Sequence, residues 1–169
     1  MEYYIVQIKL DRINYFLLWG EDEDGIDKFL MDHGKVLHFH NLDNLLLHVK
    51  KETIELAVDD GEAPNVTDVF DLDKINFWVK HPRKHIDTNM FNQAWNYAGD
   101  LNATIPFDFR KHYKNKVTLK IYDKLFWGLN LPVVTPAGRY YVPLWKHKEV
   151  MLLRNVMRDV IEGFRKALV

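Results

Sequence analysis

The spacing of apolar residues changes along this chain, and the change restricts the folds that it can adopt. In residues 2–10 and 14–20, Tyr, Ile, Val and Phe are frequent and apolar positions alternate, as in strands with one buried face. In residues 146–168, apolar side chains recur at i, i+3, i+4 and i+7, as in an amphipathic helix. Strands followed by helices predict an α+β fold, with an N-terminal antiparallel sheet packed against a mainly helical C-terminal half.

The length of 169 residues fits a single domain, which we expect to span residues 1–169. Gly61 and Pro64 mark a soft boundary at which we do not divide the chain. Further strands are expected at 35–40 and 53–58, and an extended hairpin at 133–143. Further helices are expected at 41–52, 70–81, 89–103 and 116–130.

The composition argues against most kinds of catalytic site. The chain contains no cysteine and no serine, which excludes disulfides, thiolate metal sites and the common cysteine and serine nucleophiles. It has no Walker loop and no GxGxxG motif that would hold a phosphate. His38 and His40 share one face of an expected strand, but no third ligand follows at a recognisable spacing, so we interpret them as structural or solvated. We therefore expect a protein that is not an enzyme and has no metal or other cofactor.

The N-terminus does not resemble a targeting sequence. MEYYIVQIKLD lacks the basic region and the apolar core of a signal peptide. No stretch approaches the roughly 18 uninterrupted apolar residues of a membrane helix. We expect a soluble, cytoplasmic protein with no membrane partner.

The near-neutral net charge of −1 hides a strong asymmetry. Residues 1–73 hold 17 acidic and 6 basic side chains, a net charge of −11, whereas residues 74–169 hold 7 and 17, a net charge of +10. Such a split indicates either two halves that neutralise each other in the fold or a surface that meets a charged partner. The densest acidic stretch is EDEDGID at 21–27, which lacks the alternating ligands of a calcium loop.

Five carboxylates within seven residues repel one another unless a cationic surface faces them. A basic protein partner would relieve this repulsion and would be steered towards the patch. Trp19, beside the acidic run, is a candidate apolar anchor for such a partner, although as a strand residue it also fits the core. The expected partner-binding residues are the acidic side chains of this run and of the following loop: Glu21, Asp22, Glu23, Asp24, Asp27, Asp59, Asp60 and Glu62.

The basic second half supports an alternative, a nucleic-acid-binding protein or an enzyme that uses this half. Its cations fall on the polar side of the last expected helix and between residues 111 and 124: Arg154, Arg158, Arg165, Lys166, Lys111, Lys114, Lys116, Lys120 and Lys124. No binding module is recognisable, so we favour a solvated helix face and expect no direct nucleic-acid contact. A subunit of a larger assembly is a third possibility.

Several strings of the second half resemble bacterial immunity proteins of polymorphic-toxin and contact-dependent growth inhibition systems. They are FDLDKINFWV, MFNQAWNYAGDLNATI, IYDKLFWGLNLP and YVPLW, followed by the long last helix. Within them the resemblance depends on Trp95–Asn96 with Asp100–Leu101, on Tyr122 to Phe126, and on Asn130 to Pro132. It covers roughly residues 36–165 and departs from the family at Asn102 or Thr104, where many members have serine.

The resemblance implies a protein that acts by binding. Immunity proteins of this kind bind one cognate toxin in the cytoplasm and block its active site or its access to substrate. The toxins are often nucleases with basic clefts, which matches a partner for an acidic surface. Trp95, Asn96 and Asp100 are expected to be core and helix-junction residues and not contacts, with Asn96 and Asp100 tying helix ends or loop backbone together.

Overall fold

A mixed sheet forms the N-terminal part of the fold. The computed structural model of the chain describes residues 2–58 and 61–168. Four strands lie in the order β3-β2-β1-β7, and β6 pairs with β2 beside β3. A separate two-stranded ribbon joins β4 to β5. The strands are β1 (Tyr4–Leu10), β2 (Ile13–Glu21), β3 (Asp27–Phe29), β4 (Met31–Asp32), β5 (Lys35–Val36), β6 (His38–Phe39) and β7 (Val66–Asp71).

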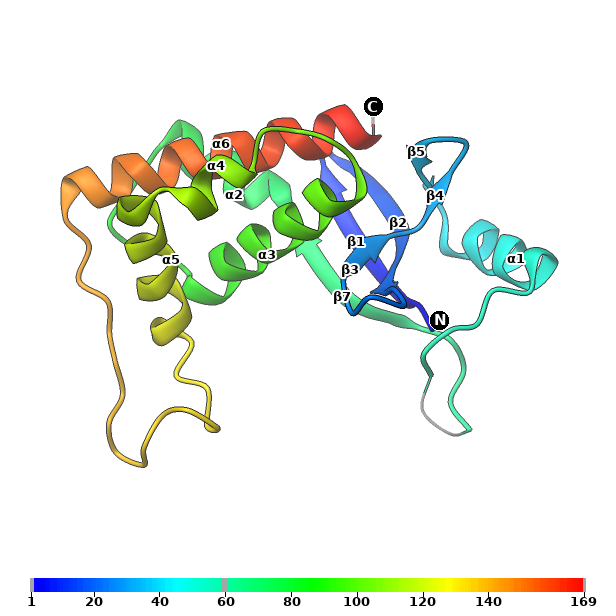
Figure 1. Cartoon of the computed structure of the whole chain (residues 1–169), viewed down its shortest axis with the longest axis horizontal. Helices are drawn as coiled ribbons and strands as arrows, with labels where there is room; N and C mark the ends of the chain where they lie inside the picture. The colour runs from blue at the N-terminus through cyan, green and yellow to red at the C-terminus, as the bar shows by residue number, and fades with distance from the viewer. Residues whose placement is uncertain (1, 59–60, 169) are drawn as a thin grey trace.

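Helices make up most of the C-terminal part. Figure 1 shows α2 to α6 grouped on one side of the sheet and α1 on the other. The long α6 runs across the top of this group, and α3 lies beneath it. The helices are α1 (Leu42–Glu52), α2 (Leu72–Lys80), α3 (Thr88–Thr104), α4 (Arg110–Lys114), α5 (Lys116–Gly128) and α6 (His147–Leu168).

The β1–β2 hairpin is closed by a two-residue turn of left-handed backbone. Asp11 and Arg12 have φ of 51° and 66°, the conformation that matches the twist of a tight hairpin. The carboxylate of Asp73 accepts hydrogen bonds from both turn amides, at 2.7 Å from Asp11 and 2.9 Å from Arg12. This contact ties the hairpin to the start of α2.

The sheet separates two cores because successive strand residues point to opposite faces. Val6 and Ile8 of β1 and Leu17 of β2 face the helical half and join a large apolar cluster there. Ile5 and Leu18 face the other way and pack against α1, in a smaller cluster with Leu45 and Val49. Both faces of β1 and β2 are therefore buried, whereas the alternation in the sequence predicts one buried face.

Close packing of α6 depends on Gly163. A Cβ atom added there would lie 2.7 Å from Cζ of Phe107. We expect Gly163→Ala to lower the free energy of unfolding by about 1–2 kcal/mol, because overpacking outweighs the helix propensity gained. Urea unfolding measures the loss. In the Phe107→Leu background the same substitution should cost less, and an equal cost in both backgrounds would contradict this contact.

The predicted fold class is confirmed: the chain is α+β, with the sheet near the N-terminus and helices mostly in the C-terminal half. The prediction of an antiparallel sheet is wrong in one respect: the sheet is mixed, because β7 pairs with β1 in parallel. The helices predicted at 41–52, 70–81, 89–103, 116–130 and 146–168 all form, with boundaries shifted by a few residues.

Four further details of the prediction are wrong. Residues 53–58 form no strand among those described, and only a single bridge joins Leu56 to Tyr3. Residues 66–71 form β7, one edge of the sheet, which the sequence does not predict, and Phe70 and Asp71 belong to this strand and not to the following helix. Residues 133–143 form no hairpin strands, and residues 35–40 break into β5 and β6 at Leu37.

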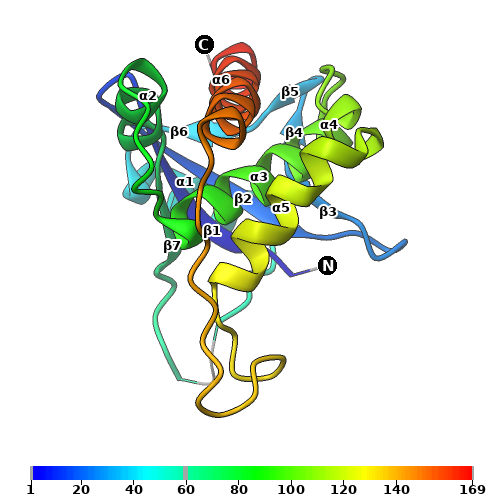
Figure 2. The ribbon, with the colours of Figure 1, turned by 90° about the vertical axis from the view of Figure 1, so that its left-hand side faces the viewer.

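The segment between α5 and α6 projects from the body and is called the arm, residues 129–146. Figures 1 and 2 both show it hanging below α5 and α6. Asn130 joins its two limbs: its side chain donates to the carbonyl of Tyr141 at 2.9 Å and accepts from the amide of the same residue at 2.7 Å. On the other side of the sheet the segments next to β7 also project downwards, so the molecule is arched (Figure 1).

Within the described chain, no helix combines the length and the apolar character that crossing a membrane requires.

Candidate functional site

The acidic run forms the turn between β2 and β3, and one of its carboxylates organises that turn. Oδ1 of Asp22 accepts from the amides of Asp24 and Ile26, at 3.0 and 2.9 Å, and Oδ2 accepts from the ammonium of Lys28. The Lys28 hydrogen bond and then the Ile26 amide lower the pKa of Asp22 below its ordinary value. Gly25 completes the turn with φ of 73°. Asp22 therefore holds the loop in shape.

Removal of this organising carboxylate should loosen the turn. We expect Asp22→Ala to lower the free energy of unfolding, because two backbone amides lose their acceptor. Asp24→Ala removes an exposed carboxylate of the same turn and should change stability by less than about 0.5 kcal/mol. Chemical unfolding of both variants provides the comparison, and equal losses would refute the assigned role of Asp22.

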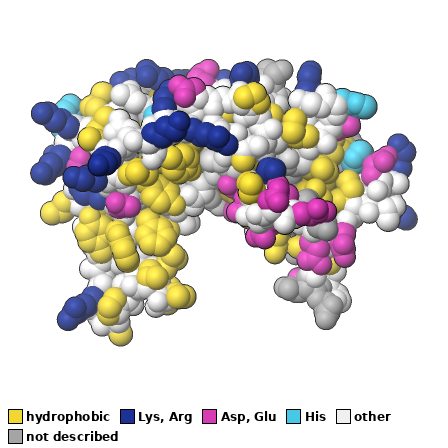
Figure 3. Space-filling model, viewed as in Figure 1, with side chains coloured by type: hydrophobic (Ala, Val, Ile, Leu, Met, Phe, Trp, Pro, Cys, Tyr) yellow, Lys and Arg dark blue, Asp and Glu magenta, His cyan; other side chains and the backbone are white. Residues whose placement is uncertain are grey.

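The other carboxylates of the turn remain available to a partner. Glu21, Glu23 and Asp24 are exposed and Asp27 is half-buried, and within the described chain none of the four forms an ion pair. Among the described residues, the ion pairs that link the acidic first half to the basic second half are Arg165–Asp11 and Lys74–Asp71. The basic half therefore does not neutralise the turn. The concave lower surface of the arch, between the arm and the segments next to β7, is called the hollow face (Figure 1). Figure 3 shows acidic side chains gathered on one side of it.

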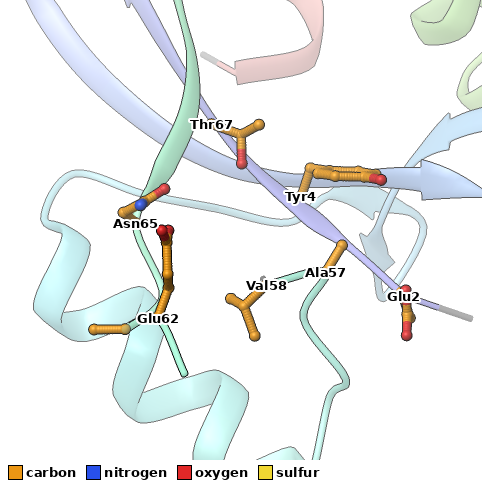
Figure 4. A pocket seen from close by; sticks show the side chains of 8 residues that line it. Glu2, Tyr4, Ala57, Val58, Glu62, Asn65 and Thr67 are labelled. Atoms are coloured by element: carbon orange, nitrogen blue, oxygen red, sulfur yellow. The ribbon is translucent and has the colours of Figure 1, made fainter. Parts of the chain in front are cut away.

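Of the remaining predicted site residues, the structure describes only Glu62, which lies apart from the turn. Glu62 lines a separate hollow beside the sheet edge with Glu2 from the N-terminus, and Tyr4 and Thr67 form its wall (Figure 4). Asp59 and Asp60 lie outside the described residues. The structure thus brings together the residues of the acidic run and leaves Glu62 at a second place.

A polar cleft opens next to the turn, between β3 and α3. We call it the carboxylate cleft. Asp27 from β3, Asp68 from β7 and Asp100 from α3 supply its acidic groups, and none of the described residues that line it is a lysine, arginine or histidine. The full set of lining residues is Trp19, Asp27, Asp68, Asn89, Asn92, Gln93, Asn96, Tyr97, Asp100 and Tyr113.

Hydrogen bonds fix two of the three carboxylates. Oδ2 of Asp68 accepts from the hydroxyl of Tyr97 at 2.8 Å and from the side-chain Nε2 of Gln93. Oδ2 of Asp100 accepts from the indole Nε1 of Trp19 at 3.0 Å. Oδ1 of Asp100 and both oxygens of Asp27 accept no side-chain hydrogen bond from any described residue. These oxygens can accept hydrogen bonds from a ligand.

Burial perturbs the acid–base chemistry of the cleft. Desolvation raises the pKa of Asp100 to about 7, the Trp19 hydrogen bond opposes this shift, and the negative charge of Asp27 adds to it. Desolvation likewise raises the pKa of Tyr97, and the Asp68 hydrogen bond adds to that rise. Asp100 therefore changes its charge near neutral pH.

The amide side chains of α3 form a wall of the cleft. Asn96 donates to Asn92 at 3.2 Å and accepts from the hydroxyl of Tyr122 at 2.9 Å. Asn92 is only 5% exposed, and its Nδ2 has no hydrogen-bond partner among the described residues. A buried amide without an acceptor is costly in a folded protein.

Sequence reasoning missed this cleft as a site. Asn96 and Asp100 were expected to tie helix ends or loop backbone together, but each instead bonds to the side chain of another element, Tyr122 or Trp19. A signal was present in the stripe of polar residues at helical spacing along α3: Asn89, Asn92, Gln93, Asn96 and Asp100. The sequence does not place Asp68 beside this stripe, because Asp68 lies in β7, which the sequence does not predict.

Trp19, the apolar anchor considered from the sequence, is not a fully exposed side chain. Its ring is half-buried, lies between Tyr4 and Tyr97 with ring centroids 5.8 Å from each, and donates to Asp100. The most exposed large apolar side chains lie instead on the arm, where Val133 is 96% and Leu144 83% exposed. Figure 3 shows this apolar surface across the hollow from the acidic side chains.

Several basic side chains of the second half already form ion pairs or hydrogen bonds within the molecule. Arg165 pairs with Asp11 and Glu162, and Lys111 pairs with Asp159. Lys124 pairs with Glu149, and Arg154 donates to the carbonyl of Val79. These contacts reduce the cationic surface left for a nucleic acid.

His38 and His40 do share one face, as predicted, with ring centroids 5.7 Å apart and both rings against Tyr15. Across residues 2–58 and 61–168, no cluster of three or more His, Cys, Asp or Glu side chains is arranged to hold a metal ion.

No protein-family model, curated protein or solved structure matches this chain. The resemblance to immunity proteins therefore depends on the sequence strings alone.

Proposed function

We propose that this protein is an immunity protein, which binds a basic toxin in the cytoplasm and neutralises it by covering its functional surface. The acidic turn supports the proposal most directly. Glu21, Glu23, Asp24 and Asp27 have no ion-pair partner in the described chain although ten excess cations lie in the second half. Carboxylates that the fold leaves unpaired are suited to meet a cationic partner, and a nuclease with a basic cleft is such a partner.

The hollow face provides the two components that a tight complex needs. Charge complementarity accelerates association and selects the partner, whereas apolar anchors supply most of the affinity. The carboxylate cleft adjoins the acidic turn through Asp27. Figure 3 shows acidic side chains on one side of the hollow and apolar side chains of the arm on the other. Neutralising a toxin calls for nanomolar binding, about −12 kcal/mol, for which charge alone is insufficient.

A growth-rescue experiment tests this function. The polypeptide encoded next to this gene is expressed in a bacterial host, alone and together with the protein. We expect growth arrest with the neighbouring polypeptide alone, recovery on co-expression, and co-purification of the two chains. A neighbouring polypeptide that is harmless, or toxicity that co-expression does not relieve, would contradict the proposal.

Charge variants separate the acidic turn from a general effect of charge. The variant E21Q/E23Q/D24N removes three exposed carboxylates and keeps Asp22, which organises the turn. The matched control E52Q/D108N/E162Q removes three exposed carboxylates from α1, the α3–α4 connection and α6. We expect weaker rescue with the first variant only, and equal rescue with both would rule out the turn as the contact surface.

A further inference from the structure

The carboxylate cleft has the size and the charge of a binding site for an organic cation. Its volume is about 480 Å³, and the described residues that line it include three carboxylates and no basic side chain. Sites for small ligands typically measure about 300–1,000 Å³. The three carboxylates do not converge as metal ligands, since no described cluster of three such groups could hold a metal ion. A larger organic cation can instead contact two of the carboxylates at once.

The unused hydrogen-bonding groups of the cleft define the ligand further. Asp27 and Oδ1 of Asp100 can accept hydrogen bonds, so they call for a donor with several N–H groups. Nδ2 of the buried Asn92 needs an acceptor, which neither an ammonium nor a guanidinium contains. A ligand that satisfies both sides combines a cationic group with a carbonyl oxygen. An arginine residue in a peptide chain is such a ligand.

We propose that the carboxylate cleft receives an arginine side chain of the protein partner, with the guanidinium between Asp27 and Asp100 and the peptide carbonyl towards the amides of α3. This inference rests on the proposed function, because it names the anchoring residue type of the same acidic surface. A guanidinium is planar and carries five N–H donors, so it can bridge two carboxylates where an ammonium acts as a single point charge.

The environment of Asp100 makes binding in this cleft dependent on pH. The polar and titratable groups that face it are Trp19 from β2, Asp27 from β3, Tyr97 from its own helix and Tyr113 from α4, and none is cationic at neutral pH. Burial holds the pKa of Asp100 at about 7, so the carboxyl is mainly protonated at pH 6 and ionised at pH 8. A bound cation favours the ionised form. We therefore expect binding to tighten between pH 6 and pH 8, by up to about tenfold per pH unit.

A peptide titration tests the proposal without the partner. The probe is acetyl-Gly-Arg-Gly-amide, and the control is the same peptide with citrulline, which has nearly the same shape and no charge. The reporter is the indole N–H resonance of Trp19, which donates to Asp100. We expect saturable shifts with the arginine peptide, a Kd of about 1 mM at pH 8 and weaker binding at pH 6, and little change with citrulline.

Two variants make the outcome specific to the cleft. Asp100→Asn should weaken arginine binding at least tenfold and abolish its pH dependence, whereas Asp123→Asn removes an exposed carboxylate of α5 and should leave both unchanged. Equal binding of arginine and citrulline peptides, or full binding by Asp100→Asn, would overturn the proposal. Because no toxin is present, that failure would concern the cleft alone, whereas the rescue experiment decides the immunity function.

Discussion

Replacement of Trp95 by alanine is expected to lower the free energy of unfolding by about 3–5 kcal/mol. Trp95 lies in the middle of α3 and has no exposed surface. Its ring contacts Tyr122 of α5 and His112 of α4, with centroids 5.4 and 6.3 Å away, and Phe109 between α3 and α4. Truncation would leave a cavity at the point where three helices meet, which the surrounding side chains could fill only in part.

Trp127 provides the matched control for this variant. It lies on α5 and is 49% exposed, so Trp127→Ala should cost less than about 1 kcal/mol. Urea unfolding of both variants, followed by circular dichroism, measures the difference. A similar loss for the two substitutions would mean that the helical half does not pack around Trp95.

Replacement of Asp100 by asparagine is expected to stabilise the protein at pH 8 by about 1–3 kcal/mol. Asparagine keeps an oxygen that can accept from the indole of Trp19 but carries no charge to desolvate. Burial and the charge of Asp27 raise the pKa of Asp100 from its ordinary value of 3.8 to about 7. The full shift of about 3 pKa units would correspond to roughly 4 kcal/mol, and we reduce this because the carboxyl lines an open cleft and is partly screened by water.

The direction of the pH effect follows from the raised pKa. Between about pH 4 and pH 7, the folded state keeps the Asp100 proton that the unfolded state releases, so ionisation of Asp100 lowers stability as the pH rises. This destabilisation is absent below about pH 4 and complete above about pH 7. The difference in stability between Asp100→Asn and the parent protein should therefore grow from near zero at pH 4 to its full value at pH 8. Thermal or urea unfolding at both values checks this, and a constant difference would contradict the buried, perturbed carboxyl.

A carboxylate that lowers stability near neutral pH fits a role in binding. If Asp100→Asn is more stable and also binds arginine more weakly, Asp100 lowers the stability of the protein and strengthens its binding of arginine. This relation links the stability measurement to the peptide titration.

The helices were predictable because their signals are local. Helix α6 shows its apolar repeat over 22 residues, and the Asn41, Asp71 and Asp87 side chains cap α1, α2 and α3. The strand β7 was not predictable, because its pairing with β1 is set by residues about 60 positions away in the chain. Its sequence VTDVFD alternates weakly and follows the Gly61 and Pro64 boundary.

The acidic turn could be predicted from the sequence and the carboxylate cleft could not, again because only the first is local in the chain. Five carboxylates in seven consecutive residues are visible in the sequence, although the structural role of Asp22 is not. The cleft joins Asp27, Asp68 and Asp100, which are about 40 and 32 residues apart and meet only after β7 and α3 are placed. The perturbed pKa of Asp100 depends on burial, which the sequence does not show.

The rate of association with the neighbouring gene's polypeptide, measured by stopped-flow fluorescence over a salt series, tests the electrostatic basis of the proposal most directly. The parent protein should associate rapidly at low salt, above about 10⁷ M⁻¹s⁻¹, and slow steeply as salt is added. The variant E21Q/E23Q/D24N should associate at least tenfold more slowly at low salt and depend less on salt, whereas E52Q/D108N/E162Q should behave like the parent protein. An unchanged rate and an unchanged salt dependence for E21Q/E23Q/D24N would contradict the acidic turn as the surface that receives a cationic partner.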